Sequence, residues 1–351
     1  MRAVRYGAFQ TLPELVTVDD PRCPAGGVVI EVAASGLCRS DWHAWMGHDP
    51  DVSVPHVPGH EFAGVIAEVG SEVRHWRSGD RVTVPFVCAC GSCASCRRGE
   101  QQVCEFQVQP GFTVWGSFAE RVAIDRADAN LVRVPEAMDL ETAASLGCRF
   151  STAYRAVVHH GRVAEGDWVV VHGCGGVGLS AVMIAVARGA RVIAVDVSPA
   201  ALELSGAIGA VATLDATQVD VVPAVRELTG GGARLSLDAL GSVATCQNSI
   251  RSLRTRGRHV QVGLMMADDA MPPVPMGYVI AAELELVGSH GMPAHAYPDM
   301  LSEILDGTLA PQRLVSRRIP LAQAPEALAG VDTQPSTGVT MVIPGDIPGQ
   351  C

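Results

Sequence analysis

The chain has 351 residues, which is enough for two or three domains, and its hydrophobic share of 48% allows each of them to bury a core. Lys and Arg total 26 against 37 Asp and Glu, so the formal net charge is −11. This acidic balance argues against binding to nucleic-acid phosphates or to an anionic membrane surface. No apolar run approaches the roughly 18–20 residues of a membrane span. We therefore expect neither a nucleic-acid nor a membrane partner.

The first residues contain no apolar run of signal-peptide length, so we expect a cytoplasmic protein. The chain has 11 cysteines, four of which lie between Cys90 and Cys104. In a reducing compartment, clustered cysteines favour a metal site over disulfides.

The first 150 residues predict an irregular β-rich domain. Gly, Pro and Asp separate the strand-like runs, with no regular helices expected between them. These runs are Val28–Ala33, Gly64–Val69, Arg81–Val84 and Phe118–Ile124.

Residues 151–289 predict a doubly wound parallel sheet, because short β-rich runs alternate with helical stretches that close at glycines. The helical stretches are Val177–Arg188, Ala200–Ile208 and Val219–Leu228. The expected strands are Trp168–His172, Arg191–Val195, a weaker Val211–Leu214, Arg234–Asp238, Arg258–Val262 and Leu284–Val287.

The last part of the chain, 290–351, predicts a helix at Tyr297–Asp306 and a strand at Gly338–Ile343. It is too small to fold alone, so we expect it to join residues 1–150 in one domain.

A glycine-rich loop follows the first strand of the predicted parallel sheet and opens a helix. Such glycines permit a tight turn and close approach of backbone N–H groups to a pyrophosphate. The next strand ends at Asp196, 18 residues after the loop. A carboxylate at this place accepts hydrogen bonds from the ribose hydroxyls of NAD and repels the 2′-phosphate of NADP. The alternative is a glycine-rich turn beside a surface aspartate. The loop residues expected to bind the cofactor are Gly173, Gly175, Gly176, Val177 and Gly178.

The four clustered cysteines have the spacing C-x2-C-x2-C-x7-C and comprise Cys90, Cys93, Cys96 and Cys104. Four thiolates without an open position describe a closed, tetrahedral structural zinc site. A four-cysteine iron–sulfur cluster is the rival interpretation, and disulfides are the third.

A second, scattered set of residues could hold another metal. Cys38 and His60 each have a carboxylate nearby in sequence, Asp41 and Glu61, and Cys148 is a candidate third ligand. Spacing alone does not establish this site, because isolated Cys and His residues are more often ordinary core or surface residues. Two thiolates and one imidazole would leave a fourth position open, as in a catalytic zinc site.

Taken together and in chain order, these motifs resemble the zinc-dependent alcohol dehydrogenases of the medium-chain dehydrogenase/reductase family. The resemblance spans nearly the whole chain. It implies a GroES-like catalytic domain (1–150 and 290–351), a Rossmann NAD-binding domain (151–289), two zinc ions per chain, NAD, and a homotetramer, with a dimer as the alternative. The segment from Cys38 to Trp45 is most similar to tetrameric microbial members that act on small alcohols.

The resemblance also implies roles for single residues. Cys38, His60 and Cys148 match the catalytic zinc ligands, Glu61 a carboxylate that approaches the metal transiently, and Asp41 the acceptor that orients the ligand imidazole. The other matched roles are a proton relay at Ser40 and His43, a cofactor-phosphate contact at Arg39, nicotinamide positioning at Thr152 and Val177, and a substrate pocket lined by Trp45 and Phe86.

Two departures from the family pattern stand out. Many members carry a basic residue after the glycine near the C-terminal strand, whereas Gly338 is followed by Val339 and Thr340. Arg149 stands where small residues are common, and the sequence gives no reason for it.

The expected activity is hydride transfer between NAD and small primary or secondary alcohols or their carbonyl partners. A polyol or specialised-metabolite dehydrogenase is the alternative within the family. A dinucleotide-binding protein without turnover is less favoured, because the catalytic ligands and the relay serine are all present.

Overall fold

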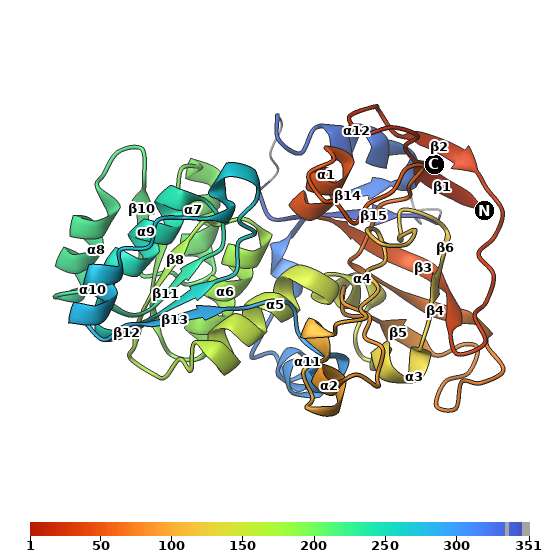
Figure 1. Cartoon of the computed structure of the whole chain (residues 1–351), viewed down its shortest axis with the longest axis horizontal. Coiled ribbons are helices and arrows are strands. Elements are labelled where there is room, and N and C mark those ends of the chain that lie inside the picture. Colours follow the sequence, from red (N-terminus) through yellow and green to blue (C-terminus); the bar gives the residue numbers. More distant parts are fainter. Residues whose placement is uncertain (334–336, 346–351) are drawn as a thin grey trace. The chain divides into compact units, whose positions relative to one another are not determined.

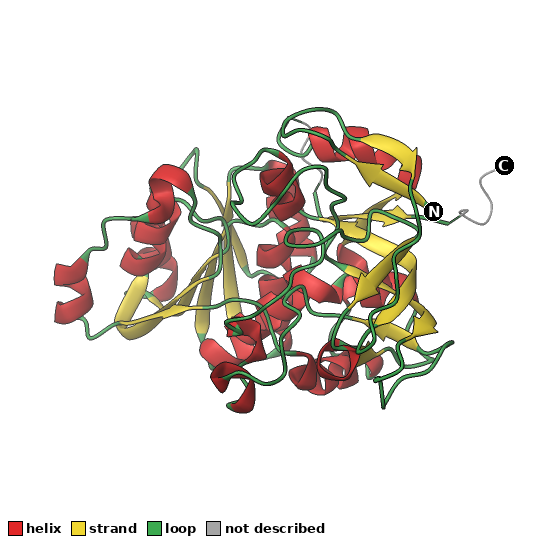
Figure 2. Ribbon diagram, turned by 45° about the vertical axis from the view of Figure 1, so that its right-hand side comes forward, coloured by secondary structure: helices red, strands yellow, loops and turns green. Residues whose placement is uncertain are grey.

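A computed structural model describes residues 1–333 and 337–345, which divide into two compact units. The first unit comprises Met1–Ser151, Gly291–Leu305 and the described residues from Pro311 on. The second comprises Thr152–His290 and Asp306–Ala310. Figure 1 shows the chain coloured along its sequence, and Figure 2 shows the distribution of helices and strands.

The first unit is built on a seven-stranded sheet of order β14-β15-β3-β4-β5-β7, with β6 also paired to β3. Its pairs are antiparallel except for β14 with β15. A separate hairpin joins β1(Arg2–Arg5) to β2(Glu14–Thr17). The sheet strands are β3(Val28–Leu37), β4(Phe62–Val69), β5(Arg81–Thr83), β6(Arg121–Ile124), β7(Val132–Arg133), β14(Val315–Pro320) and β15(Val339–Ile343).

Short helices fill the long connections of the first unit. Two buried apolar clusters flank the sheet, one around Phe62 and Ile66 and the other around Tyr6 and Phe118. The helices are α1(Arg39–Trp45), α2(Ala94–Arg97), α3(Ala127–Asn130), α4(Leu140–Ala144), α11(Tyr297–Leu305) and α12(Ala324–Ala329), and a π-helical segment, η2(Leu146–Phe150), follows α4.

The second unit is a six-stranded, wholly parallel sheet of order β10-β9-β8-β11-β12-β13. Its central strands are continuous apolar runs, as expected for strands buried on both faces. Figure 2 shows helices to both sides of these strands. The strands are β8(Trp168–His172), β9(Arg191–Asp196), β10(Ala212–Asp215), β11(Ala233–Asp238), β12(Leu253–Gln261) and β13(Glu285–Gly288).

The strand order of the second unit reverses at β8, because the chain runs outward through β9 and β10 and then returns to β11 on the other side. Ligands bind at such a reversal in doubly wound sheets, beyond the carboxyl ends of the strands. The helices are α5(Ser151–Tyr154), which begins at the unit boundary, α6(Gly176–Ala187), α7(Pro199–Ala207), α8(Val221–Thr229), α9(Val243–Arg251) and α10(Met276–Ala281).

The predicted fold class, a GroES-like β-rich domain joined to a Rossmann domain, is confirmed. The expectation of no regular helices among the first strands was wrong at α1, which directly follows Cys38. This helix has only seven residues and starts at a cysteine rather than at a common N-cap residue, so its sequence lacked the usual start signal. Among the described residues, no helix has the length and apolar character needed to cross a membrane.

Candidate zinc and dinucleotide sites

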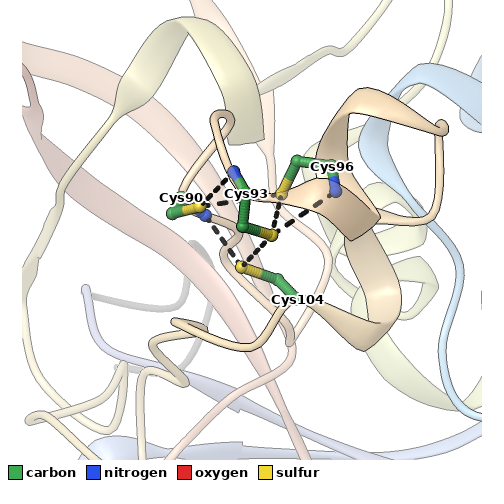
Figure 3. A group of neighbouring side chains, drawn as sticks. All are labelled: Cys90, Cys93, Cys96 and Cys104. Carbon is green, nitrogen blue, oxygen red and sulfur yellow. Dashed lines mark hydrogen bonds between the residues drawn. The ribbon is translucent and has the colours of Figure 1, made fainter.

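The four clustered thiols converge in a small lobe between β5 and β6. Their side chains point toward one another (Figure 3), with sulfur–sulfur distances of 3.4 Å for Cys93–Cys96 and 3.8 Å for both Cys90–Cys96 and Cys93–Cys104. A disulfide would need about 2 Å. Ligands about 2.3 Å from one tetrahedral zinc ion lie about 3.8 Å apart. The lobe therefore fits a single zinc ion and not disulfides.

Backbone N–H groups surround the sulfurs of this lobe. The N–H of Cys93 donates to Cys90 Sγ at 3.2 Å, and the N–H of Phe106 donates to Cys104 Sγ at 3.3 Å. Hydrogen bonds from the Ser92 backbone and hydroxyl are the main cause that lowers the pKa of Cys90 to about 6. Such donors favour the thiolate, which is the form that binds metal. The ligand atoms of all four lie within 4.8 Å of one another, which also argues against a cluster that distributes its cysteines over several irons.

The scattered ligands also converge. Cys38 lies between β3 and α1, His60 lies just before β4, and Cys148 lies in the π-helical segment η2. Their ligand atoms lie within 4.8 Å of one another, although the residues are up to 110 positions apart. Irregular π-helical turns are frequent at functional sites, and this one brings a thiol to the other two ligands. Three ligands leave one position open for a further molecule.

The tautomer and orientation of His60 suit a metal ligand. Its ring is fully buried, and Nδ1 lies 2.8 Å from Asp41 Oδ1, so this nitrogen carries the proton. The other nitrogen, Nε2, is buried and has no hydrogen-bond partner among the described residues. A buried nitrogen without a partner is costly unless something binds it. A zinc ion held by His60 Nε2 and the two thiols would satisfy it.

The two thiols of this site differ in pKa, which is lowered for Cys38 and raised for Cys148. The hydrogen bond with Cys148 is the largest cause that lowers the pKa of Cys38 well below its ordinary value, and the positive charge of Arg149 acts in the same direction. This shift favours the thiolate of Cys38, the form required of a zinc ligand.

The carboxylate of Glu61 points to Arg149 in this structure. The Arg149 guanidinium forms a buried ion pair with one carboxylate oxygen, and the Arg149 backbone N–H donates to the other at 2.9 Å. Arg149 thus has a partner that its sequence position did not suggest.

The residues assigned by resemblance to the proton relay and the cofactor phosphate lie on α1. Ser40 Oγ lies 3.8 Å from Cys38 Sγ, and His43 Nδ1 lies 3.1 Å from Nδ1 of the exposed His48. Burial, followed by the charges of Arg39 and His48, lowers the pKa of His43, so it is neutral at pH 7 and able to accept a proton. Arg39 forms an exposed ion pair with Asp332 at 2.7 Å.

Aromatic rings surround His60. Phe112 is buried and lies 4.9 Å from the His60 ring, and Phe86 lies 6.4 Å away, both measured between ring centroids. Trp45 belongs to the buried cluster around Tyr6 and donates its indole N–H to Thr11 O at 2.7 Å. Trp45 is thus a core residue in this structure, while Phe112, which no sequence motif marked, flanks the ligand.

The glycine loop of the second unit has the geometry of a phosphate cradle. Gly173 has φ +88°, and a Cβ at Gly178 would lie 1.8 Å from the Gly173 carbonyl oxygen, so neither position tolerates a side chain. Gly175 is exposed and directly precedes α6, and a Cβ at this position would have no atom within 4 Å. The loop thus leads directly into the N-terminus of a twelve-residue helix, the kind of place where backbone N–H groups bind phosphate.

Asp196 lies at the end of β9 and faces this loop. One carboxylate oxygen accepts from the Cys174 N–H at 2.5 Å, and the other accepts from Val197 and Ser198 N–H groups at 2.8 Å each. The carboxylate is therefore fixed next to the loop. Of the nicotinamide-positioning candidates, Val177 lies half-buried on the first turn of α6, and Thr152 is buried with no hydroxyl partner among the described residues.

Comparison with known proteins agrees with this geometry. Residues 24–136 match the alcohol dehydrogenase GroES-like domain, and residues 176–306 match the zinc-binding dehydrogenase domain. An alcohol dehydrogenase of Geobacillus stearothermophilus is 34% identical over 293 residues, covering 82% of this chain and 84% of that protein. The chain belongs to the zinc-type alcohol dehydrogenases of the medium-chain dehydrogenase/reductase family.

Solved structures support the same assignment. The alcohol dehydrogenase TADH from Thermus sp. ATN1 is 32% identical and superposes with a TM-score of 0.90, covering 98% of this chain and 99% of that one. A zinc-binding dehydrogenase from Sinorhizobium meliloti 1021, described as bound to NADP, is 27% identical with a TM-score of 0.88, covering 98% and 99%. Since this relative is bound to NADP, family membership alone does not select NAD, and the residues of this chain must decide it.

Proposed function

We propose that this protein is an NAD-dependent, zinc-dependent dehydrogenase that interconverts small primary or secondary alcohols with their aldehydes or ketones. The observation that supports this most directly is the convergence of the buried His60 Nε2, which has no hydrogen-bond partner among the described residues, with the thiols of Cys38 and Cys148. A non-catalytic member would have no reason to retain three converging ligands with an open position.

The reaction needs an acidified hydroxyl, a hydride acceptor and a path for the proton. A zinc ion held by Cys38, His60 and Cys148 would supply Lewis acidity toward the alcohol oxygen, and NAD would accept the hydride. Asp41 fixes the tautomer and orientation of His60 through its 2.8 Å contact with Nδ1. Ser40 and His43 are the groups proposed to pass the substrate proton toward solvent, and His43 is neutral at pH 7, as this role requires.

We propose NAD as the coenzyme because of Asp196. A fixed carboxylate beside the phosphate-binding loop accepts hydrogen bonds from ribose hydroxyls and repels a 2′-phosphate. No basic residue in Val197, Ser198 or Pro199 offers compensation. The loop glycines and Asp196 would hold the coenzyme, with Thr152, Val177 and Arg39 as further contacts.

A small, largely apolar substrate fits the residues near His60. Phe112 and Phe86 present rings rather than hydrogen-bonding groups, and a polyol would leave its hydroxyls without partners against them. A polyol or specialised-metabolite dehydrogenase is the second candidate and differs only in this pocket.

The lobe of Cys90, Cys93, Cys96 and Cys104 is proposed to hold a second, structural zinc ion, which brings the total to two per chain. We also propose a homotetramer, with a dimer as the alternative. The edge strand β13 and exposed apolar side chains at Met276 and Ile280 support self-association through the second unit.

The direct test is NADH formation by the zinc-loaded protein with a graded panel of primary and secondary alcohols and polyols, repeated with NADP. We expect turnover with small alcohols and NAD. Preference for polyols would favour the second candidate, and no turnover with any substrate in a folded, zinc-loaded protein would contradict the proposed activity.

A further inference from the structure

Arg149 directly follows the candidate ligand Cys148, and its side chain is only 8% exposed. Its guanidinium makes two contacts with different parts of the chain. One nitrogen donates to the Leu37 carbonyl oxygen at 2.9 Å, and the other pairs with the carboxylate of Glu61, which is fully buried. The backbone N–H of Arg149 donates to the second carboxylate oxygen of Glu61 at 2.9 Å.

Each group in this network adjoins one of the three candidate ligands in sequence. Leu37 precedes Cys38, Glu61 follows His60, and Arg149 follows Cys148. The strands β3 and β4 already pair with each other, and the Arg149 guanidinium adds a connection from the end of β3 and the segment before β4 to the segment η2.

The surrounding backbone is shaped to admit this pair. A Cβ at Gly36 would lie 2.3 Å from Glu61 Oε2 and 2.6 Å from the Arg149 guanidinium, so any other residue there would displace the ion pair. The Gly36 N–H also donates to the Glu61 carbonyl oxygen at 2.6 Å. The main chain of β3 thus holds Glu61 from one side, while Arg149 holds it from the other.

A buried ion pair is not by itself a gain in stability, because the desolvation of two charges offsets much of their attraction. Its geometric effect is larger, because a guanidinium has donors in fixed directions and holds its partners at defined angles. We propose that Arg149 and Glu61 form a clamp that holds the three ligand-bearing segments at coordinating distance before the metal binds. Both are positioning residues, and the role of Glu61 is to pair with Arg149 rather than to bind the metal. This inference rests on the zinc site of the proposed function.

The test is the metal affinity of metal-stripped full-length protein, titrated with Co²⁺ and Zn²⁺ against a chelator, with the Co²⁺ absorption spectrum as a second readout. Arg149→Met removes the clamp. We expect it to weaken one of the two metal equivalents by about 10- to 100-fold, as is usual when a group that supports metal ligands is lost. The Co²⁺ spectrum of that equivalent should also change, while the other equivalent keeps its affinity.

Two further variants separate clamping from other effects. Arg149→Lys keeps the charge, but its single nitrogen cannot take the place of the two guanidinium nitrogens that contact Leu37 and Glu61. We therefore expect an intermediate loss of metal affinity. Arg149→Lys also serves as the test if Arg149→Met does not fold. The double variant Arg149→Met/Glu61→Gln removes both charges; the clamp predicts that its affinity stays low, whereas restored affinity would mean that Arg149 only neutralises Glu61 and would overturn the proposal.

Arg258→Met is the matched control. Arg258 is 2% exposed and pairs with Glu285 in the second unit. The Arg258→Met variant should lose stability and keep the affinity of both metal equivalents. If Arg149→Met behaves in the same way, the pair is merely structural and the clamp is refuted. If the unaltered protein binds only one metal equivalent, the proposed catalytic zinc site fails first, and the clamp fails with it.

Discussion

Single residues at the two sites are defined by their hydrogen-bond partners. Asp41 lies at hydrogen-bonding distance from one ring nitrogen of His60, and the other nitrogen has no partner in the part of the chain that the structure describes. Asp196 accepts hydrogen bonds from three backbone N–H groups beside the glycine loop. In both cases a carboxylate fixes the chemistry of a neighbouring group without reacting itself. These two residues therefore give the most specific expectations about metal and coenzyme.

The first prediction concerns coenzyme choice. Asp196→Asn removes the charge that repels a 2′-phosphate and keeps a hydrogen-bonding side chain. We expect the ratio of kcat/KM for NADP to that for NAD to rise about tenfold or more, equivalent to about 1.4 kcal/mol of lost repulsion. Steady-state kinetics with both coenzymes measures it, and Asp215→Asn, at the end of the neighbouring β10, is the control. An unchanged ratio would contradict the role of Asp196.

Arg149 shows where sequence reasoning stops at this scale. Its partner Glu61 is 88 residues away, and no local pattern relates them. Phe112 was missed for the same reason, because only folding brings its ring next to His60. The four clustered cysteines and the glycine loop after a strand are local signals and could be predicted, whereas Cys38, His60 and Cys148 were expected only from the resemblance.

At the scale of elements, the parallel sheet was the most predictable part of the chain. Its central strands β8 and β9 are short apolar runs, and burial on both faces leaves little choice of pattern there. By contrast, β12 begins at Leu253, five residues before the expected start, because Leu253 pairs with Ala233, and the residues between Leu253 and Arg258 lie in a register irregularity. The helix α9 was also missed, as its Thr, Gln, Asn and Ser give little helical signal without the Ser242 cap.

The lobe between β5 and β6 gives the second prediction. Its four sulfurs form most of a small buried cluster, with few other apolar side chains. A bound zinc ion would therefore supply much of its folding free energy. We expect Cys93→Ala to lose one zinc ion per chain and to lower the Tm by about 5 °C or more.

Calorimetry and zinc analysis measure the effect of Cys93→Ala. Cys23→Ala, outside both ligand sets, is the control and should change neither value. A Cys93→Ala protein with unchanged Tm would show that the lobe needs no metal.

The buried histidines of the parallel sheet give the third prediction. Burial lowers the pKa of His172 to about 3 and that of His259 to about 4, so both are neutral in the folded protein. An unfolded histidine titrates near 6.5. Stability contributed by neutral burial is thus complete above pH 6.5 and is lost as pH falls toward these folded values, because the unfolded state binds the extra protons.

Between pH 6.5 and 5 we expect the free energy of unfolding to fall by on the order of 2 kcal/mol for each of these histidines. His172→Leu should remove one such contribution and flatten the pH dependence of urea unfolding. His75→Leu, at an exposed position, should not. Equal pH dependence in the original protein and in His172→Leu would contradict this account.

At the scale of the whole molecule, the family assignment rests on two domain matches and on relatives that cover most of the chain. The order of the motifs along the sequence predicted the family, because the ligand motifs and the glycine loop follow one another as they do in its members. The assembly of several chains was expected only from the similarity of the segment from Cys38 to Trp45 to tetrameric members.

The fourth prediction concerns that assembly. Ile280, on α10, is 73% exposed, and β13 ends the parallel sheet of the second unit. If copies associate there, Ile280→Asp places a charge in an apolar interface and should shift the protein toward smaller species in sedimentation. Val211→Asp, at a side chain that is 58% exposed beside the opposite edge strand, should not. A stable monomer of the original protein at micromolar concentration would contradict self-association.

The central claim is that Cys38, His60 and Cys148 hold a catalytic zinc ion, and the most direct measurement is zinc content together with NADH formation in Cys38→Ala. We expect one zinc ion per chain instead of two, an unchanged circular dichroism spectrum and turnover reduced to background, because an open site needs all its ligands while the fold does not. Two zinc ions per chain, or normal alcohol oxidation, in the folded Cys38→Ala protein would contradict the account.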